Sequence, residues 1–483
     1  AHRAGGIFYI EYGKYISINC SIFVASLSKK GAAIYLSRKV NKFHMYHSDF
    51  SHNSATLEAG VLLADSVEYF RNEQCLFQQN KALSQGVFSI HHFMISVHIM
   101  CLFEGNTAKE DAGVAKYQEG RTFIDIESKY INNKCMESGG ALYLNKIKNV
   151  RTEKNKVIHC TAAQKGGGLY LEEIGSVLLV KSNFIYNFAL EGGSIFGLHL
   201  TDANSHQSKF YENKAVGETS SDGGAISIGN IRSFQLVYCA FFANNATGKG
   251  GAIKQSNVLF AHDSFLRLNY VVFANNTSGQ NGGSLNIDQV NFLEIHHTNF
   301  INQISLQQGG AVYINSKNIF CQLNVSKTAM TQNNAKLRGA ALYLSHVAEV
   351  NITNVVLGAN VANETGGGIY IFLLEEIIST INIASTVFAK NKAVKEGDTM
   401  VVTGATRLSL SDSSVEDTIQ KNFKAHTKNL LILHSTIITL HNIKIVTMNM
   451  GNIPLNLTTN MLNITTNMLN ITKNLAFKCP ALT

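Results

Sequence analysis

The chain has 483 residues, of which 38 are glycine, two are proline and none is tryptophan. Apolar residues make up 45% and charged residues only 15%, which excludes an intrinsically disordered chain. The net charge of +8 comes from 41 basic and 33 acidic residues without a basic run, so nothing indicates nucleic-acid binding. No apolar run reaches the ~18 residues that span a bilayer. The scarcity of proline favours a long sheet, because proline cannot donate a hydrogen bond to a β-ladder.

A glycine-led motif recurs along most of the chain. Fifteen copies, from Gly5 to Gly397, begin 26 to 32 residues apart and most often 27. The clear copies are GGALYL from Gly139, GGGLYL from Gly166, GGSIFG from Gly192, GGAISI from Gly223, GGAIKQ from Gly250, GGSLNI from Gly282, GGAVYI from Gly309 and GGGIYI from Gly366. A second motif, F-x-x-N, precedes the next glycine by a nearly constant interval at Phe50, Phe77, Phe103, Phe184, Phe210, Phe241, Phe273 and Phe388. Two motifs in fixed phase predict a repeat protein.

Each repeat predicts two short strands joined by turns. Apolar residues at positions four and six, such as Leu142 and Leu144, alternate as in a strand with one buried face. The phenylalanine and a small residue two positions before it form a second alternating segment. The glycine pair suits a turn with positive φ, and the asparagine of F-x-x-N suits a turn that tolerates the left-handed conformation.

Strands and tight turns repeating every ~27 residues predict an all-β parallel β-helix of about 15 coils. Equivalent positions then stack into ladders, with leucine, isoleucine and phenylalanine inside and asparagine amides hydrogen-bonded along the axis. The L-x-x-L-x-L lattice of a leucine-rich repeat is missing.

The paired motifs GGA-[ILV] and F-x-x-N resemble the repeat of the chlamydial polymorphic outer membrane proteins and of similar protist surface proteins. The resemblance covers residues 1–403. It implies a right-handed helix, a place at the cell surface and a role in adhesion or matrix building, and it does not imply catalysis.

The ends of the chain depart from the repeat. A complete glycine motif starts at Gly5 without a capping element, so we expect either a preceding segment or stacking on another subunit. Residues 404–450 lose the glycines but keep apolar alternation, which predicts degenerate terminal coils. Residues 451–483 contain an Asn/Thr-rich seven-residue repeat, interpreted as a stalk or cap.

Several N-x-[ST] sequons predict N-linked glycans on a secreted chain. The predicted sites are Asn245, Asn276, Asn324, Asn351, Asn363, Asn456, Asn463 and Asn470, and further sequons begin at Asn19 and Asn275. Chance matches are the alternative in a chain this rich in asparagine, serine and threonine.

Tyrosine fills the fifth, outward position of seven repeats. These residues are Tyr9, Tyr35, Tyr143, Tyr170, Tyr313, Tyr343 and Tyr370. They predict short exposed aromatic columns, with Tyr143, Tyr170, Tyr313, Tyr343 and Tyr370 as a candidate strip for extracellular glycans or a partner subunit. The alternative is that tyrosine simply suits an exposed strand.

Two pairs of cysteines fall on neighbouring coils. Cys135 and Cys160 lie near turns and form a candidate disulfide, while Cys75 and Cys101 are candidates either for a bond or for small core residues. No C-x-x-C motif supports a metal or redox site.

The sequence predicts no catalytic site, cofactor or metal. Aspartates such as Asp125 and Asp288 never occupy the same repeat position in neighbouring coils, so the facing carboxylates of glycoside cleavage are not expected. We therefore expect an extracellular structural glycoprotein that associates with itself, end to end or side by side, into a filament or coat. The alternatives are a surface adhesin that binds glycans or cell-surface ligands and, third, a carbohydrate-active enzyme.

Overall fold

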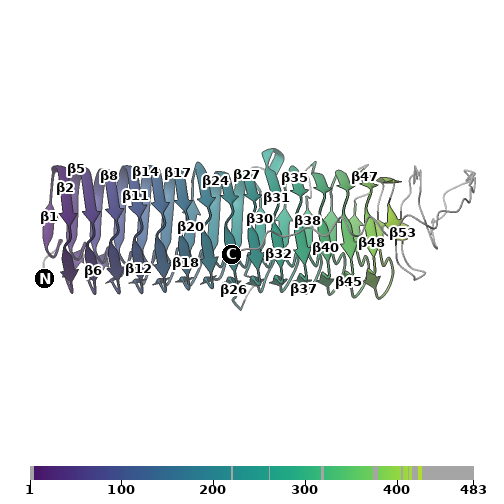
Figure 1. The fold of residues 1–483 in the computed structure, drawn as a ribbon, viewed down its shortest axis with the longest axis horizontal. Coiled ribbons are helices and arrows are strands. Elements are labelled where there is room, and N and C mark those ends of the chain that lie inside the picture. The colour runs from purple at the N-terminus through teal and green to yellow at the C-terminus, as the bar shows by residue number, and fades with distance from the viewer. Residues whose placement is uncertain are drawn as a thin grey trace, which may run out of the picture. The chain divides into compact units, whose positions relative to one another are not determined.

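The chain winds into stacked coils of parallel β-strands, shown in a computed structural model in Figure 1. The residues that the structure describes are 5–218, 221–259, 261–316, 320–373, 379–403, 406–411, 413–415 and 423–426. Three parallel sheets of 24, 15 and 14 strands run along the stack, and one 3-10 helix, η1 (Ala261–Asp263), is the one helix in these ranges. The predicted all-β parallel β-helix is confirmed.

One coil contributes a strand to each sheet. In the best-formed coils β17 (Leu142–Glu153) lies in the wide sheet, β18 (Lys156–Ile158) in the phenylalanine sheet and β19 (Thr161–Ala162) in the alanine sheet. In other coils, and in every described coil after β27, the wide-sheet strand is divided, as in β42 (Leu342–Ser345) and β43 (Glu349–Thr353). The undivided long strands are β5 (Ile34–Tyr46), β8 (Leu62–Glu73), β11 (Phe88–Ile99), β14 (Ala115–Ile126), β17, β24 (Ile195–His206) and β27 (Ile226–Val237).

The sheets continue past residue 403. Strand β51 (Thr406–Ser411) pairs with β47 (Ser379–Ala384), and β53 (Phe423–His426) pairs with β50 (Met400–Thr403). The predicted terminal segment 404–450 is therefore described only in part. The predicted tail at 451–483 lies outside the described residues.

Equivalent positions of neighbouring coils are paired in register. Phe50, Phe77 and Phe103 follow one another in the phenylalanine sheet, with ring centroids 5.1 and 4.9 Å apart and nearly parallel planes. All three rings are fully buried. One continuous apolar core therefore runs through the coils, and each side chain packs against its own counterpart in the next coil.

The glycine pair allows the close approach of one coil to the next. Gly139 has a φ of 75°, which a side chain disfavours. A Cβ on Gly140 would lie 2.0 Å from the carbonyl oxygen of Gly167 in the next coil. The first glycine thus serves the turn and the second serves the stacking.

The turn at F-x-x-N differs in detail from the prediction. The positive φ belongs to the residue before the asparagine, for example His52 at 57° and Gln79 at 51°, while Asn53 and Asn80 point inward and are fully buried. The sequence motif marks the turn correctly but assigns the left-handed conformation to the wrong residue. The asparagine position instead needs a short polar side chain that can form hydrogen bonds inside the core.

The buried asparagines form the predicted axial ladder. The Nδ2 group of Asn80 donates to Oδ1 of Asn106 at 3.0 Å and to the main-chain oxygen of Phe50 at 2.9 Å. The backbone N–H of Asn80 donates to the same Oδ1 at 3.0 Å. Each amide therefore pairs main-chain groups that would otherwise be buried without a partner.

Cys160 interrupts this ladder. Asn133 Nδ2 still donates to the Phe103 carbonyl at 2.9 Å, but along the ladder it meets the Cys160 sulfur at 3.8 Å instead of an asparagine oxygen. The Tyr130 carbonyl, which an amide would satisfy, receives the weaker thiol donor at 3.5 Å.

We expect Cys160→Asn to raise the free energy of unfolding by about 1 kcal/mol, the usual net value of a restored hydrogen bond. Urea unfolding followed by circular dichroism measures the change. Cys160→Ser, whose side chain is too short to reach the ladder, is the matched control. An asparagine variant no more stable than the serine variant would contradict the prediction.

Candidate functional site

The tyrosine column stacks as expected. The ring centroids of Tyr143 and Tyr170 are 4.4 Å apart, and those of Tyr313, Tyr343 and Tyr370 follow at 5.0 and 5.3 Å with planes within 10°. The rings lie on the outer face of the wide sheet, at paired positions of neighbouring coils.

Most of the column is buried, however, and Tyr143 and Tyr313 are half-buried. Tyr170, Tyr343 and Tyr370 retain only 8, 7 and 6% of their accessible surface. Other residues at the same position, such as Leu63 and Ser89, are each 1% exposed. The prediction of an exposed aromatic strip is therefore wrong at these three tyrosines. The position forms a second, narrow packing layer outside the wide sheet.

Neighbouring groups also cover the ends of the stacks. The Lys116 ammonium lies 4.4 Å from the Tyr143 ring centroid, and the Arg338 guanidinium lies 5.3 Å from that of Tyr370. Val401 is the strand partner of Tyr370 on the following coil. Since the ring faces contact each other, the cations or the next coil, they are not available to a sugar ring.

Charged side chains beside the column are paired. Lys116 lies 3.2 Å from the Asp111 carboxylate, and Oε2 of Glu172 accepts from the Tyr143 hydroxyl at 3.1 Å and from Asn145 at 3.0 Å. Burial, with the nearby Glu172 charge, raises the pKa of Tyr170 to about 12. The Tyr170 phenol therefore stays protonated at neutral pH. The contacts of Lys116 and Glu172 hold the tyrosine rings in place, and the shift of the Tyr170 pKa is away from neutrality, unlike that of a general acid or base.

The predicted disulfide between Cys135 and Cys160 is absent. Both cysteines are free and buried. Cys135 packs in a small cluster with Ala108, Ala162 and Ala189, whereas Cys160 occupies the asparagine ladder in the main core. The two residues stand at different positions of their coils, which separates their side chains. Burial raises the pKa of the Cys160 thiol to about 11, so it is also unreactive.

Cys75 and Cys101 are free core residues as well. Each thiol donates to the carbonyl oxygen two residues earlier, Cys75 to Glu73 at 3.3 Å and Cys101 to Ile99 at 3.5 Å. Of the two alternatives predicted for this pair, a disulfide bond or small core residues, the structure supports small core residues.

The sequons differ sharply in accessibility. Asn363 is exposed and Asn245 half-buried, so both side chains reach the surface. Asn324 and Asn351 are half-buried neighbours joined by a 3.0 Å hydrogen bond from Asn351 Nδ2. Asn276 belongs to the core ladder and is fully buried, so this predicted glycan site is wrong for the folded chain. Asn456, Asn463 and Asn470 lie outside the described residues.

A polar cluster inside the core was not predicted. His98, Tyr117, Asp125 and Tyr130 are fully buried. His98 Nε2 and the Tyr117 hydroxyl are 2.5 Å apart, and the Tyr130 hydroxyl donates to Asp125 Oδ2 at 2.7 Å. The repeat contains a signal for this cluster. His98 and Asp125 stand in register at an inward position, and two coils after Asp125 the same position holds the apolar Leu179.

Two hollows bear on ligand binding. One, of about 350 Å³, lies on the surface of the first coils beside Cys20, His47 and Asp49. In the described part of the chain no hydrogen bond joins the Cys20 thiol to His47, so the arrangement of an activated nucleophile is not present. Nor do the described side chains include a group of three or more histidines, cysteines or carboxylates suited to a metal ion.

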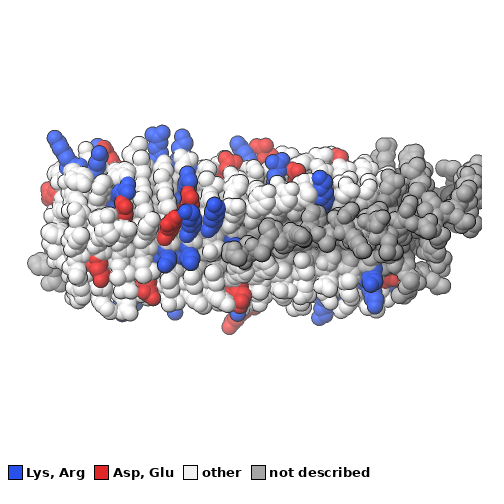
Figure 2. Space-filling model, viewed as in Figure 1, with Lys and Arg blue, Asp and Glu red and all other residues white. Residues whose placement is uncertain are grey.

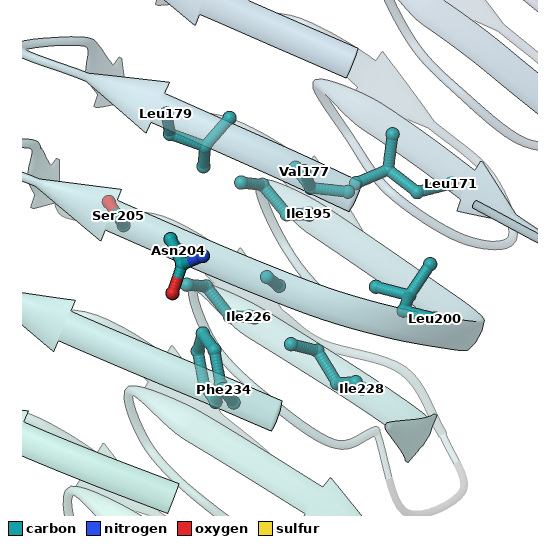
Figure 3. A pocket seen from close by; sticks show the side chains of 11 residues that line it. Leu171, Val177, Leu179, Ile195, Leu200, Asn204, Ser205, Ile226, Ile228 and Phe234 are labelled. Atoms are coloured by element: carbon teal, nitrogen blue, oxygen red, sulfur yellow. The ribbon is translucent and has the colours of Figure 1, made fainter. Parts of the chain in front are cut away.

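The other hollow is internal. Figure 3 shows its walls, formed mainly by apolar side chains of three successive coils, among them Leu171, Ile195 and Phe234, with Asn204 and Ser205 at one side. Its volume of about 20 Å³ would hold roughly one water molecule, but a cavity with mainly apolar walls offers water few partners. Ala203 lines it at a position where the preceding coil has Val177.

Ala203→Val is expected to raise the free energy of unfolding by about 1 kcal/mol, because the added methyl groups fill this cavity. The midpoint of urea unfolding reports the change. The same substitution at Ala189, which is fully buried in the alanine sheet, should lower stability through overpacking. Equal effects at both positions would count against the cavity explanation.

The visible surface is sparsely charged. Figure 2 shows basic and acidic side chains singly or in small groups between wide uncharged areas. Among the described residues, ion pairs join neighbouring coils, such as Lys154 with Glu127 at 2.7 Å and Arg267 with Glu294 at 2.8 Å. Exposed pairs of this kind contribute little to stability.

Comparison of the chain with protein-family models, with curated proteins and with solved structures finds no match. Within the described ranges no helix has the length and apolarity needed to cross a membrane.

Proposed function

We propose that this chain is a structural surface glycoprotein whose solenoid packs side by side with copies of itself to build a coat or filament. One observation carries the proposal. The outer face of the phenylalanine sheet bears no charged side chain over six consecutive coils. This neutral face consists of Ala240, Phe242, Val272, Ala274, Asn299, Ile301, Ala329, Thr331, Val356, Gly358, Val387 and Ala389.

The neutral face suits contact with another flat sheet. Its residues alternate with inward ones such as Phe241 and Phe273, so they point outward, and all of them except Ala274, which is 8% exposed, are at least partly accessible. Soluble domains usually carry about 25% charged residues, which keep surfaces apart. Here small and apolar side chains would allow two sheets to approach at the ~10 Å spacing of stacked sheets.

The size of the neutral face favours an extended assembly over an isolated pair. Six coils of three-residue strands offer roughly 300 Å² by standard strand dimensions. A stable dimer buries about 800 Å² on each partner. Contacts repeated along and between many copies would supply the remaining area, as in a coat or filament.

Two further features fit a surface location. Asn363 presents a sequon to solvent, and the paired repeat motifs resemble those of polymorphic outer membrane proteins. Adhesion remains the alternative. The tyrosine column, whose ring faces are covered, gives adhesion no specific support.

Charge placed on the neutral face tests the proposal. The double variant Val272→Lys, Val356→Lys should abolish concentration-dependent association in sedimentation velocity. Lys129 and Lys156 occupy the same strand position in other coils, so the fold tolerates lysine there. The matched control is Thr107→Lys with Thr161→Lys on the alanine sheet, where Lys134 stands between them in register.

The control variant should associate like the unmodified chain. Association that is unaffected by the Val272 and Val356 substitutions would refute the neutral face as the contact. An unmodified chain that stays monomeric and binds on a glycan array would instead support adhesion.

A further inference from the structure

Two sequons overlap at residues 275–278, in the turn before β33 (Thr277–Ser278). Asn275-Asn276-Thr277 is one and Asn276-Thr277-Ser278 is the other. The two asparagines are adjacent in sequence but lie in opposite environments. Asn275 is exposed, whereas Asn276 is fully buried.

Asn276 is fully engaged in the asparagine ladder. Its Nδ2 donates to the Phe241 carbonyl at 3.1 Å and to Gln303 Oε1 at 3.0 Å. Its Oδ1 accepts from both the backbone N–H and Nδ2 of Asn244, each at 3.0 Å. A sugar on this Nδ2 would remove a donor and place a large polar group in the core, so a chain modified there could not complete the coil.

Asn275 offers its side chain to solvent. It has the left-handed φ of 57°, a conformation that asparagine adopts more readily than most residues. Its Oδ1 accepts from Asn302 Nδ2 at 2.8 Å. Among the described contacts its own Nδ2, the atom that N-glycosylation modifies, donates to no protein group.

The rest of the ladder shows why this double sequon is unusual. Two residues after each buried ladder asparagine the chain has a small residue of the alanine sheet, for example Ala82 after Asn80, which makes no sequon. Serine takes that place at Ser28, Ser278 and Ser305, and the ladder residues before the first and the third are Ser26 and Gln303. Of the described ladder asparagines, only Asn276 is therefore followed by the hydroxyl residue of a sequon.

We propose that Asn275, and not Asn276, carries an N-linked glycan. This inference rests on the proposed function in that the chain must enter a secretory route. In the transfer, the bond between the sugar C1 and the phosphate oxygen of a polyprenyl-pyrophosphate oligosaccharide breaks. The Asn275 Nδ2–C1 bond forms, Nδ2 loses one proton, and the polyprenyl pyrophosphate leaves.

The position of Asn275 gives the glycan a structural consequence. The residue follows β32 (Val272–Ala274) of the phenylalanine sheet and precedes the alanine sheet, so the glycan leaves from the corner beside the neutral face. It would limit the side from which another copy can approach that face.

Two single substitutions separate the sites. Thr277→Ala removes the sequon of Asn275 and leaves Asn276-Ala-Ser, whereas Ser278→Ala removes that of Asn276 and leaves Asn275-Asn-Thr. Both variants should fold, because Thr277 is half-buried at the surface and alanine is the usual residue at position 278. Each is expressed in a eukaryotic secretory host behind a signal peptide, and fragmentation mass spectrometry locates the glycan.

We expect the unmodified chain and Ser278→Ala to carry the glycan on Asn275, and Thr277→Ala to lose it. A glycan on Asn276 of the secreted, folded protein would overturn the inference. So would an unmodified Asn275 in a chain that carries a glycan at Asn363, although the proposed glycoprotein would then stand. Absence of glycans from every sequon of the secreted chain would overturn both.

Discussion

Replacing Asn106 with leucine is expected to lower the free energy of unfolding by about 3–5 kcal/mol, because several buried polar groups lose their partners at once. Oδ1 of Asn106 accepts from the backbone N–H and from Nδ2 of Asn80, each at 3.0 Å. Its Nδ2 donates to the Phe77 carbonyl at 2.9 Å and to Oδ1 of Asn133 at 3.0 Å. Leucine has a similar size and satisfies none of these groups.

Urea unfolding of the full chain measures this loss. Thr107→Ala, next to the ladder but only half-buried, is the control and should change stability by less than about 0.5 kcal/mol. Asn106→Gln should be intermediate, since Gln303 fills the same role in another coil. If the leucine variant were as stable as the Thr107 control, the ladder would not hold the coils together.

Asp125→Asn is expected to stabilise the protein in a pH-dependent way. Burial raises the pKa of Asp125 from 3.8 to about 6. A raised carboxyl pKa means that the folded state prefers the protonated form. The stability contributed by that form is fully present below pH 3.8 and is lost as the pH rises through about 6.

The difference between the variant and the unmodified chain should therefore grow with pH. It should be near zero at pH 3.8 and reach about 3 kcal/mol at pH 7, following 1.36 kcal/mol per unit of pKa. The amide keeps an oxygen for the Tyr130 hydroxyl, which donates to Asp125 Oδ2 at 2.7 Å. Denaturant unfolding at several pH values measures the difference. A difference that does not vary with pH would contradict the buried charge as its cause.

His98 responds to pH in the opposite sense. Burial lowers its pKa from 6.5 to about 3, so the folded state excludes its proton. Stability is then lost as the pH falls below 6.5. Because His98 is present in both proteins, its contribution cancels in the comparison of Asp125→Asn with the unmodified chain.

Repeat spacing alone predicts the architecture, because a repeat that stacks in register places equivalent residues in the same environment. The inward columns of Phe77 and Leu142 and the asparagine ladder follow from alternation and motif phase. Spacing does not reveal what lies over an outward position. The packing that leaves Tyr343 7% exposed is a tertiary feature, which the alternation within its own strand does not show.

The predicted disulfide and the predicted glycan on Asn276 are wrong for a different reason: closeness in the chain or in the stack does not fix where a side chain points. Cys135 and Cys160 lie on adjacent coils, but their register places Cys135 opposite Ala162 and Cys160 in the ladder. Asn276 matches a sequon yet occupies a ladder position. In both cases the spacing of the F-x-x-N motif places the residue, Cys160 or Asn276, at the inward asparagine position and so predicts that it is buried.

Electron microscopy of the purified chain tests the proposed assembly most directly. The proposal predicts solenoids lying side by side in arrays or filaments, and their dispersal into single particles in the Val272→Lys, Val356→Lys variant. Single, separate solenoids of the unmodified chain at every concentration would contradict it.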